Sequence, residues 1–160
     1  MSKPPAPAAG NLIQLPRANR LENALAKWLG ADYFARMEHA SGFLKMVNEA
    51  RPRVKEVTIA QARERLAQNP RAILLDVRED SEWRNGRAAQ AVHLGKGVLE
   101  RDLEKMVPDA GTEIIMYCGG GFRSVLTADS AQKMGYQNVA SLIGGYKALV
   151  EAKWPMKSGD

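Results

Sequence analysis

The sequence is poor in the residues that tie small proteins together through disulfides or metals. Its 160 residues include one cysteine, Cys118, and two histidines, His39 and His93. A single cysteine excludes a disulfide within the chain and a cysteine-rich zinc site, and two distant histidines give no basis for expecting a structural metal site. A chain of this length buries roughly two-thirds of the surface of its unfolded form, so its core needs no such links.

The sequence also lacks a long hydrophobic run. No stretch approaches the roughly 20 apolar residues that span a bilayer, and residues 1–10 have no apolar core of the kind that a secretory signal carries. We therefore expect a cytoplasmic protein with no membrane partner. Lys and Arg outnumber Asp and Glu by 23 to 18, but they alternate with acidic residues and form no run with interleaved aromatic side chains. We do not expect nucleic acid as the main ligand.

Three regions follow one another along the chain. Residues 1–15 begin with a Pro/Ala-rich stretch that cannot build a packed core, and we expect a disordered tail there. In residues 16–52, apolar side chains recur at helical spacing until Pro52, which predicts a helical extension. In residues 53–160, short apolar runs alternate with helical patterns, which predicts one α/β domain with a parallel sheet.

Within the third region, individual elements can be located. Thr58 and Gln61 have the spacing of a capping box, in which each side chain satisfies a backbone amide at the start of a helix. The run from Ala72 to Val77 is apolar except for Asp76, which is typical of a strand covered on both faces. The expected strands span 72–77, 91–94, 113–118 and 139–142, and the expected helices span 58–68, 81–85, 98–106, 123–134 and 146–152.

The most informative segment follows the expected strand at 113–118. The strand ends in Cys118, followed by Gly119, Gly120, Gly121, Phe122, Arg123 and Ser124. The carboxyl ends of parallel strands form the ligand-binding edge of a sheet, so Cys118 lies where a substrate can reach it. Glycines can turn successive amides toward one point, and the next helix adds its positive end. The segment therefore predicts an anion cradle around a sulfur nucleophile.

From about Val54 to Trp154, the chain resembles a single rhodanese domain. The motifs that carry the resemblance are Asp76-Val77-Arg78-Glu79, Glu82-Trp83 with Gly86, the loop from Cys118 to Ser124, and Gly144-Gly145. The loop is specific, whereas the glycine pair alone would be weak. The resemblance implies a rhodanese-like α/β fold, with a mostly parallel sheet of about five strands flanked by helices, here preceded by a helical segment.

The resemblance also implies sulfurtransferase chemistry. Cys118 would take a sulfane sulfur from thiosulfate or another small anionic donor, become a persulfide, and pass the sulfur to cyanide or a thiol. Arg123 would face the donor, and the amides from Gly119 to Ser124 would hold the persulfide. Ser124 would also cap the helix and hydrogen-bond to Cys118.

Two further residues have an implied supporting role, since Asp76 and Arg78 would order the loop from a neighbouring strand end. No cofactor is expected beyond the covalent persulfide. With no second thiol to resolve that persulfide, turnover would be ping-pong with an external acceptor.

Two other functions are compatible with the residues. A cysteine phosphatase also uses a cysteine, a loop and an arginine. Its loop holds five residues between the cysteine and the arginine, whereas only four separate Cys118 from Arg123. A noncatalytic docking or regulatory module of the same fold would work through the helical segment. Residues 20–51 either pack on their own domain or contact a second copy of the chain or a protein that accepts sulfur.

Overall fold

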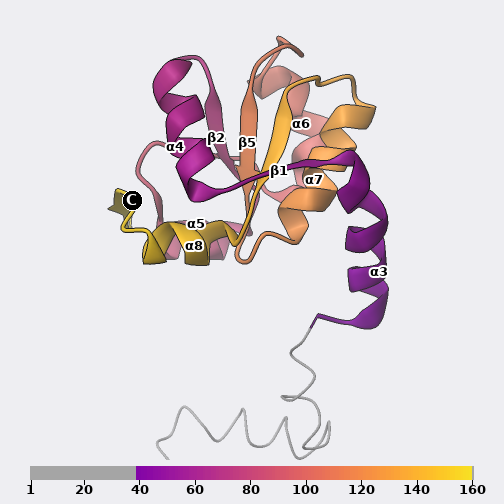
Figure 1. Cartoon of the computed structure of the whole chain (residues 1–160), viewed down its shortest axis with the longest axis horizontal. Helices are drawn as coiled ribbons and strands as arrows, with labels where there is room; N and C mark the ends of the chain where they lie inside the picture. Colours follow the sequence, from indigo (N-terminus) through magenta and orange to yellow (C-terminus); the bar gives the residue numbers. More distant parts are fainter. Residues whose placement is uncertain (1–38, 160) are drawn as a thin grey trace, which may run out of the picture. The chain divides into compact units, whose positions relative to one another are not determined.

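The computed structural model describes residues 39–159, and the chain from Ser41 onward forms one compact unit. Its centre is a five-stranded sheet with the strand order β1-β6-β5-β2-β4, in which every neighbouring pair is parallel (Figure 1). The strands are β1 (Lys55–Val57), β2 (Ile73–Asp76), β4 (Val92–His93), β5 (Ile114–Tyr117) and β6 (Val139–Leu142). The α/β fold with a mostly parallel sheet is confirmed.

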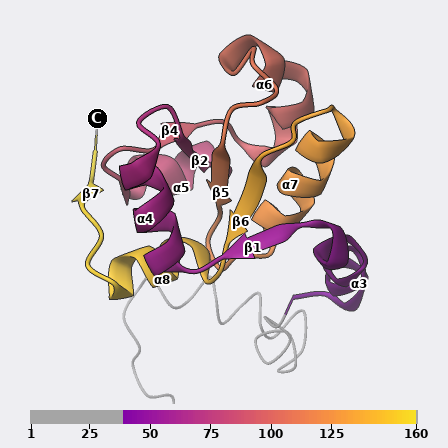
Figure 2. The ribbon, with the colours of Figure 1, turned by 45° about the horizontal axis from the view of Figure 1, so that its top comes forward.

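Helices cover both faces of this sheet (Figure 2). One face carries α3 (Ser41–Ala50), α6 (Leu99–Met106) and α7 (Arg123–Lys133), and the other carries α4 (Ile59–Gln68) and α8 (Gly145–Glu151). A short helix, α5 (Asp80–Asn85), follows β2, and the 3-10 turns η1 (Arg51–Arg53) and η2 (Lys96–Val98) precede β1 and α6. Between residues 39 and 159, no helix has the length and hydrophobicity needed to cross a membrane.

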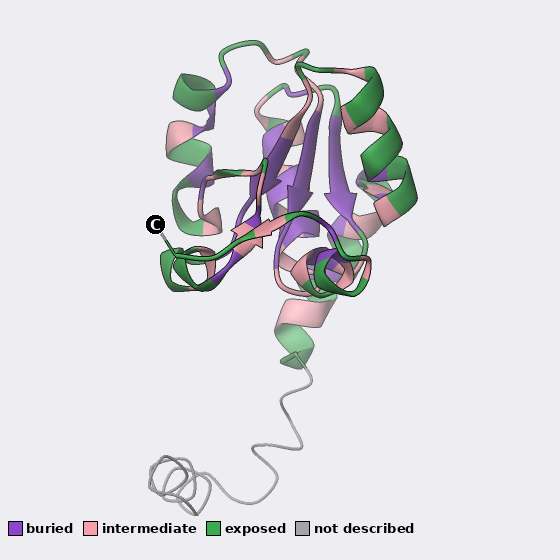
Figure 3. Ribbon diagram, turned by 90° about the vertical axis from the view of Figure 1, so that its left-hand side faces the viewer, coloured by how far each residue is buried: buried purple, intermediate pink, exposed green. Residues whose placement is uncertain are grey.

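The central strands show why a continuous apolar run was informative. In β5, Ile114 and Met116 point into the core under α6 and α7, whereas Ile115 and Tyr117 point into the core under α4 and α8. All four side chains are fully buried, and Figure 3 shows buried strands between helices whose outer surfaces are exposed. Successive side chains of a strand point to opposite faces, so two covered faces require apolar residues at every position.

Local sequence motifs predicted some of the helix and strand boundaries but not all of them. The Thr58 hydroxyl accepts a hydrogen bond from the Gln61 amide, and the Gln61 side chain accepts one from the Thr58 amide at 2.9 Å, as the capping box predicts. Two features have no counterpart among the expected strands: β1, and a two-stranded antiparallel pair formed by β3 (Arg87–Ala88) and β7 (Met156–Lys157). Strands of two or three residues are too short to show a periodic pattern.

Part of the expected helical extension packs on the domain. In α3, Val47 and Ala50 are buried in the same core as α7. The expected disordered tail at 1–15, and the extension before residue 39, lie outside the described residues.

An ion pair ties this region to α7. The Arg53 guanidinium donates to both carboxylate oxygens of Asp129, at 2.8 and 3.0 Å, and the Lys133 ammonium lies 2.7 Å from the same carboxylate. These contacts, chiefly the hydrogen bonds from Arg53, lower the pKa of Asp129 to about 2. This ion pair thus joins η1, the turn before β1, to α7, the helix that follows the cysteine loop.

We expect Asp129→Asn to lower the Tm by about 2–5 °C at pH 7, because the pair is partly exposed and screened. The depressed pKa means that the stabilisation is complete above about pH 4 and is lost as the pH falls toward about 2. Thermal unfolding of the two proteins between pH 7 and pH 3 should therefore show a difference in Tm that shrinks below pH 4. Arg53→Gln is the matched variant, and fully additive effects in the double variant would contradict the pairing.

Candidate active site

Cys118 lies at the carboxyl edge of the sheet, directly after the central strand β5. Because β5 pairs with β2 on one side and with β6 on the other, the segments that follow these three strands meet at this edge. The segment after β2 contains Arg78, and the segment after β6 contains Gly144 and Gly145. Motifs that are far apart in the sequence are therefore neighbours around the cysteine.

The Cys118 side chain is buried, with 1% of the residue exposed. The Gly121 amide donates a hydrogen bond to its Sγ at 3.2 Å, and the Ser124 hydroxyl oxygen lies 3.6 Å from the same sulfur. The Ser124 hydroxyl in turn shares a 2.8 Å hydrogen bond with the hydroxyl of Ser141 in β6. Negative charge on the sulfur would thus have an amide donor already directed at it and a hydroxyl within reach.

The expectation that Ser124 caps the helix is wrong. Helix α7 begins at Arg123, its N-cap residue is Phe122, and no side chain caps its first amides. A capping side chain must belong to the residue that precedes the first helical turn, and Ser124 already lies within that turn. Its hydroxyl reaches back toward the sulfur instead.

Glycines bring the start of α8 against the cysteine loop. Gly145 has a φ of +53°, and a Cβ atom there would overlap the Cys118 carbonyl oxygen and lie 2.9 Å from the Gly121 nitrogen. The close approach lets the Tyr146 amide donate to the Cys118 carbonyl at 2.7 Å and the Lys147 amide donate to the Gly119 carbonyl at 3.2 Å. The glycine pair, weak as a sequence motif, is required by this contact.

Arg123 does not point into open space. Its guanidinium donates two hydrogen bonds to the carboxylate of Glu82 in α5, at 2.7 and 2.9 Å, and lies 3.9 Å from a carboxylate oxygen of Glu79. The hydrogen bonds to Glu82 are the main cause of a raised pKa for Arg123, and they lower the pKa of Glu82. The residue expected to face an anionic donor is paired with a protein carboxylate.

Asp76 and Arg78 form a buried pair that does not touch the sulfur. Both carboxylate oxygens of Asp76 accept hydrogen bonds from the Arg78 guanidinium, the shortest at 2.6 Å, and the two residues are 0% and 3% exposed. The guanidinium also donates to the Gly86 carbonyl at 2.7 Å and stacks 4.1 Å above the Tyr146 ring. The pair therefore reaches the cysteine loop through Tyr146, next to Gly145.

The remaining loop residues differ in exposure. Gly119 and Gly120 are half-exposed and Gly121 is buried. The half-buried Phe122 packs against the core under α6 and α7, with the Arg51 guanidinium 5.8 Å from its ring centre. Ser141, Glu82 and Tyr146 were not among the site residues expected from the sequence. Ser141 lies inside a strand with no local pattern to distinguish it, and Glu82 entered only as part of a family motif.

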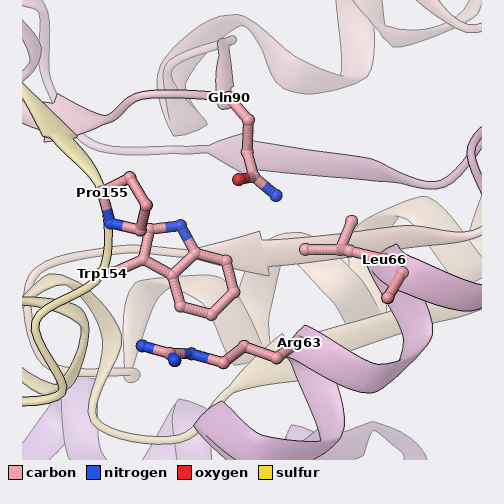
Figure 4. A pocket seen from close by; sticks show the side chains of 6 residues that line it. Arg63, Leu66, Gln90, Trp154 and Pro155 are labelled. Carbon is pink, nitrogen blue, oxygen red and sulfur yellow. The ribbon is translucent and has the colours of Figure 1, made fainter.

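A cavity of about 300 Å³ opens beside the loop. Its lining residues are Arg78, Glu82, Asn85, Gly86, Gly119, Tyr146 and Lys147. A separate cavity of about 310 Å³ lies under α4, where the Arg63 guanidinium stacks 5.1 Å from the Trp154 ring, and it contains none of the expected site residues (Figure 4). No group of three or more His, Cys, Asp or Glu side chains in residues 39–159 could hold a metal ion.

We expect Gly145→Ala to lower the free energy of unfolding by more than the strain of a positive φ alone would. The control is Gly135→Ala, since Gly135 also has a positive φ but has no atom within 4 Å of a Cβ position. Strain at a positive φ costs about 1–2 kcal/mol, and overlap with the Cys118 carbonyl should bring the Gly145→Ala loss to about 3 kcal/mol or more. Urea unfolding measures the free energy of unfolding of both variants. Equal losses in the two variants would show that the contact between Gly145 and the cysteine loop adds nothing to stability.

Sequence comparisons agree with the motif-based resemblance. The rhodanese-like domain family matches residues 58–152 of this chain. YtwF of Bacillus subtilis, which carries the provisional name of sulfurtransferase, is 30% identical over 95 residues, covering 59% of this chain and 89% of that protein. The thiosulfate sulfurtransferase GlpE of Glaesserella parasuis is 30% identical over 104 residues, covering 65% of this chain and 94% of that protein.

A solved structure shares the same fold. The protein RPA3614 of Rhodopseudomonas palustris, of unknown function and described as a possible tyrosine phosphatase, superimposes with a TM-score of 0.62 at 27% identity, covering 74% of this chain and 96% of that one. The family match spans more than half of the chain and includes the cysteine loop, the Asp76–Arg78 pair and the glycine pair. This chain therefore belongs to the rhodanese-like domain family.

Proposed function

We propose that the protein is a sulfurtransferase that carries sulfane sulfur on Cys118. The observation that supports this most strongly is the cysteine sulfur held by the Gly121 amide at 3.2 Å, inside a glycine loop at the carboxyl edge of the sheet. The chain belongs to a family in which relatives at about 30% identity bear the name sulfurtransferase. Thiosulfate, which is named for one of those relatives, is the donor that we propose.

In the first half-reaction, the Cys118 thiolate attacks the outer sulfur of thiosulfate. A sulfur–sulfur bond forms to Cys118 while the sulfur–sulfur bond of thiosulfate breaks, and its electron pair leaves with sulfite. The protein now carries a persulfide anion, and the total charge is unchanged. The loop amides and the Ser124 hydroxyl stabilise that anion, because donors fixed in advance cost no reorganisation when charge moves onto the outer sulfur.

In the second half-reaction, an external acceptor takes the outer sulfur. Cyanide attacks it, the bond to Cys118 breaks, and thiocyanate leaves while the thiolate returns to its starting state. A thiolate acceptor would leave as a persulfide in the same way. With a single cysteine in the chain, no internal disulfide can release the sulfur. We therefore propose a ping-pong cycle without a cofactor.

Two alternatives have less support. A phosphatase needs its loop arginine to bind phosphate, and here the Arg123 guanidinium is held by two hydrogen bonds to Glu82. The loop also holds four residues between Cys118 and Arg123, one fewer than cysteine phosphatases use. A noncatalytic docking module has no need for a buried thiol directed at an amide and a hydroxyl.

The test is intact-mass spectrometry of the protein after incubation with thiosulfate. We expect wild type to gain one sulfur, about 32 Da, and to lose it on addition of cyanide with release of an equal amount of thiocyanate. The matched control is Cys118→Ser, which keeps the loop sequence but should gain no mass. If wild type gains no sulfur from thiosulfate or from mercaptopyruvate, the proposed function is wrong.

A further inference from the structure

The cavity beside the cysteine loop contains charged side chains that are already paired. Arg78 is neutralised by Asp76, and Glu82 is neutralised by Arg123. The exposed carboxylate of Glu79 lies 3.9 Å from Arg123 and adds further negative charge. The arginine of the loop therefore offers little net attraction to an incoming anion. A donor that carries two negative charges needs another cation at this edge.

Lys147 is placed to be that cation. It lies in the first turn of α8, it is one of the residues that line the cavity, and its amide donates a hydrogen bond to the Gly119 carbonyl at 3.2 Å. The residue is exposed, and no described carboxylate lies within ion-pair distance of its ammonium in residues 39–159. This hydrogen bond holds the backbone of Lys147 against Gly119, the residue that follows Cys118.

We propose that Lys147 determines the charge preference of the donor site, so that inorganic dianions are favoured over organic monoanions. This inference rests on the proposed function for its substrate. The ammonium attracts thiosulfate to the mouth of the cavity and favours sulfite formation beside it, while the loop amides hold the charge on Cys118. Lys147 is a specificity-determining residue and makes or breaks no covalent bond.

The expected size follows from Coulomb attraction in a wet cavity. At about 6 Å and near the dielectric constant of water, one added positive charge changes the affinity for a monoanion by about threefold and for a dianion by about tenfold. Salt at molar concentration should remove most of either effect, because it shortens the screening length to about 3 Å.

The single cysteine permits a direct measurement that needs no turnover. We would compare the rates at which iodoacetate, an anion, and iodoacetamide, which is neutral, alkylate Cys118 at low salt. Lys147→Met should lower the iodoacetate-to-iodoacetamide rate ratio by about threefold, whereas Lys147→Arg should leave it near wild type. The matched control is Lys105→Met, because Lys105 lies in the last turn of α6 and its side chain is 78% exposed. Helix α6 lies at the other end of the sheet from α8 in Figures 1 and 2.

The second measurement is kcat/KM for thiosulfate with cyanide as acceptor. We expect Lys147→Met to lose about tenfold through KM, and the loss should be smaller for a monoanionic donor such as mercaptopyruvate. An unchanged alkylation ratio and an unchanged kcat/KM in Lys147→Met would overturn the inference and leave the sulfurtransferase function intact.

The two proposals fail in different ways. A lowered alkylation ratio in Lys147→Met, together with a wild-type protein that takes no sulfur from any donor, would contradict the proposed function and support the role of Lys147 in attracting anions. A wild-type Cys118 that reacted with neither the alkylating reagents nor the donors would overturn both.

Discussion

The cysteine site depends on one backbone contact, the hydrogen bond from the Tyr146 amide to the Cys118 carbonyl at 2.7 Å. It joins the loop after β5 to the start of the helix after β6, and it forms only because Gly145 has no Cβ atom. The guanidinium of Arg78 stacks on the Tyr146 ring at 4.1 Å, so the segment after β2 meets the same point. The segments that follow three strands thus meet at this contact, next to Cys118.

Much of the fold could be predicted because neighbouring residues carry the signal. A strand buried on both faces must be apolar at each position, and β5 meets that rule with four buried residues. A capping box is complete within four residues, and the one at Thr58 was found. In β1, by contrast, only Val57 is buried, and its strand conformation comes from pairing with β6, some 80 residues later. Pairing between distant segments leaves no local pattern.

The candidate site divides in the same way. Cys118 and the glycines that follow it could be predicted, because the residues that form the loop are consecutive in the sequence. The partners of its side chains could not. Glu82 reaches Arg123 across 41 positions, and a sequence does not tell whether an arginine faces a ligand or a carboxylate. Ser141 meets Ser124 only because β6 lies next to β5.

The pairing of β1 with β6 has a consequence for where this domain begins. The family match starts at residue 58, just after β1 ends at Val57. A fragment cut at that point would leave β6, the strand that carries Ser141, with an unpaired row of backbone amides and carbonyls open to other chains. It would also remove Val47 and Val54 from the core. The family match therefore begins inside the compact unit, which already includes α3 and starts at Ser41.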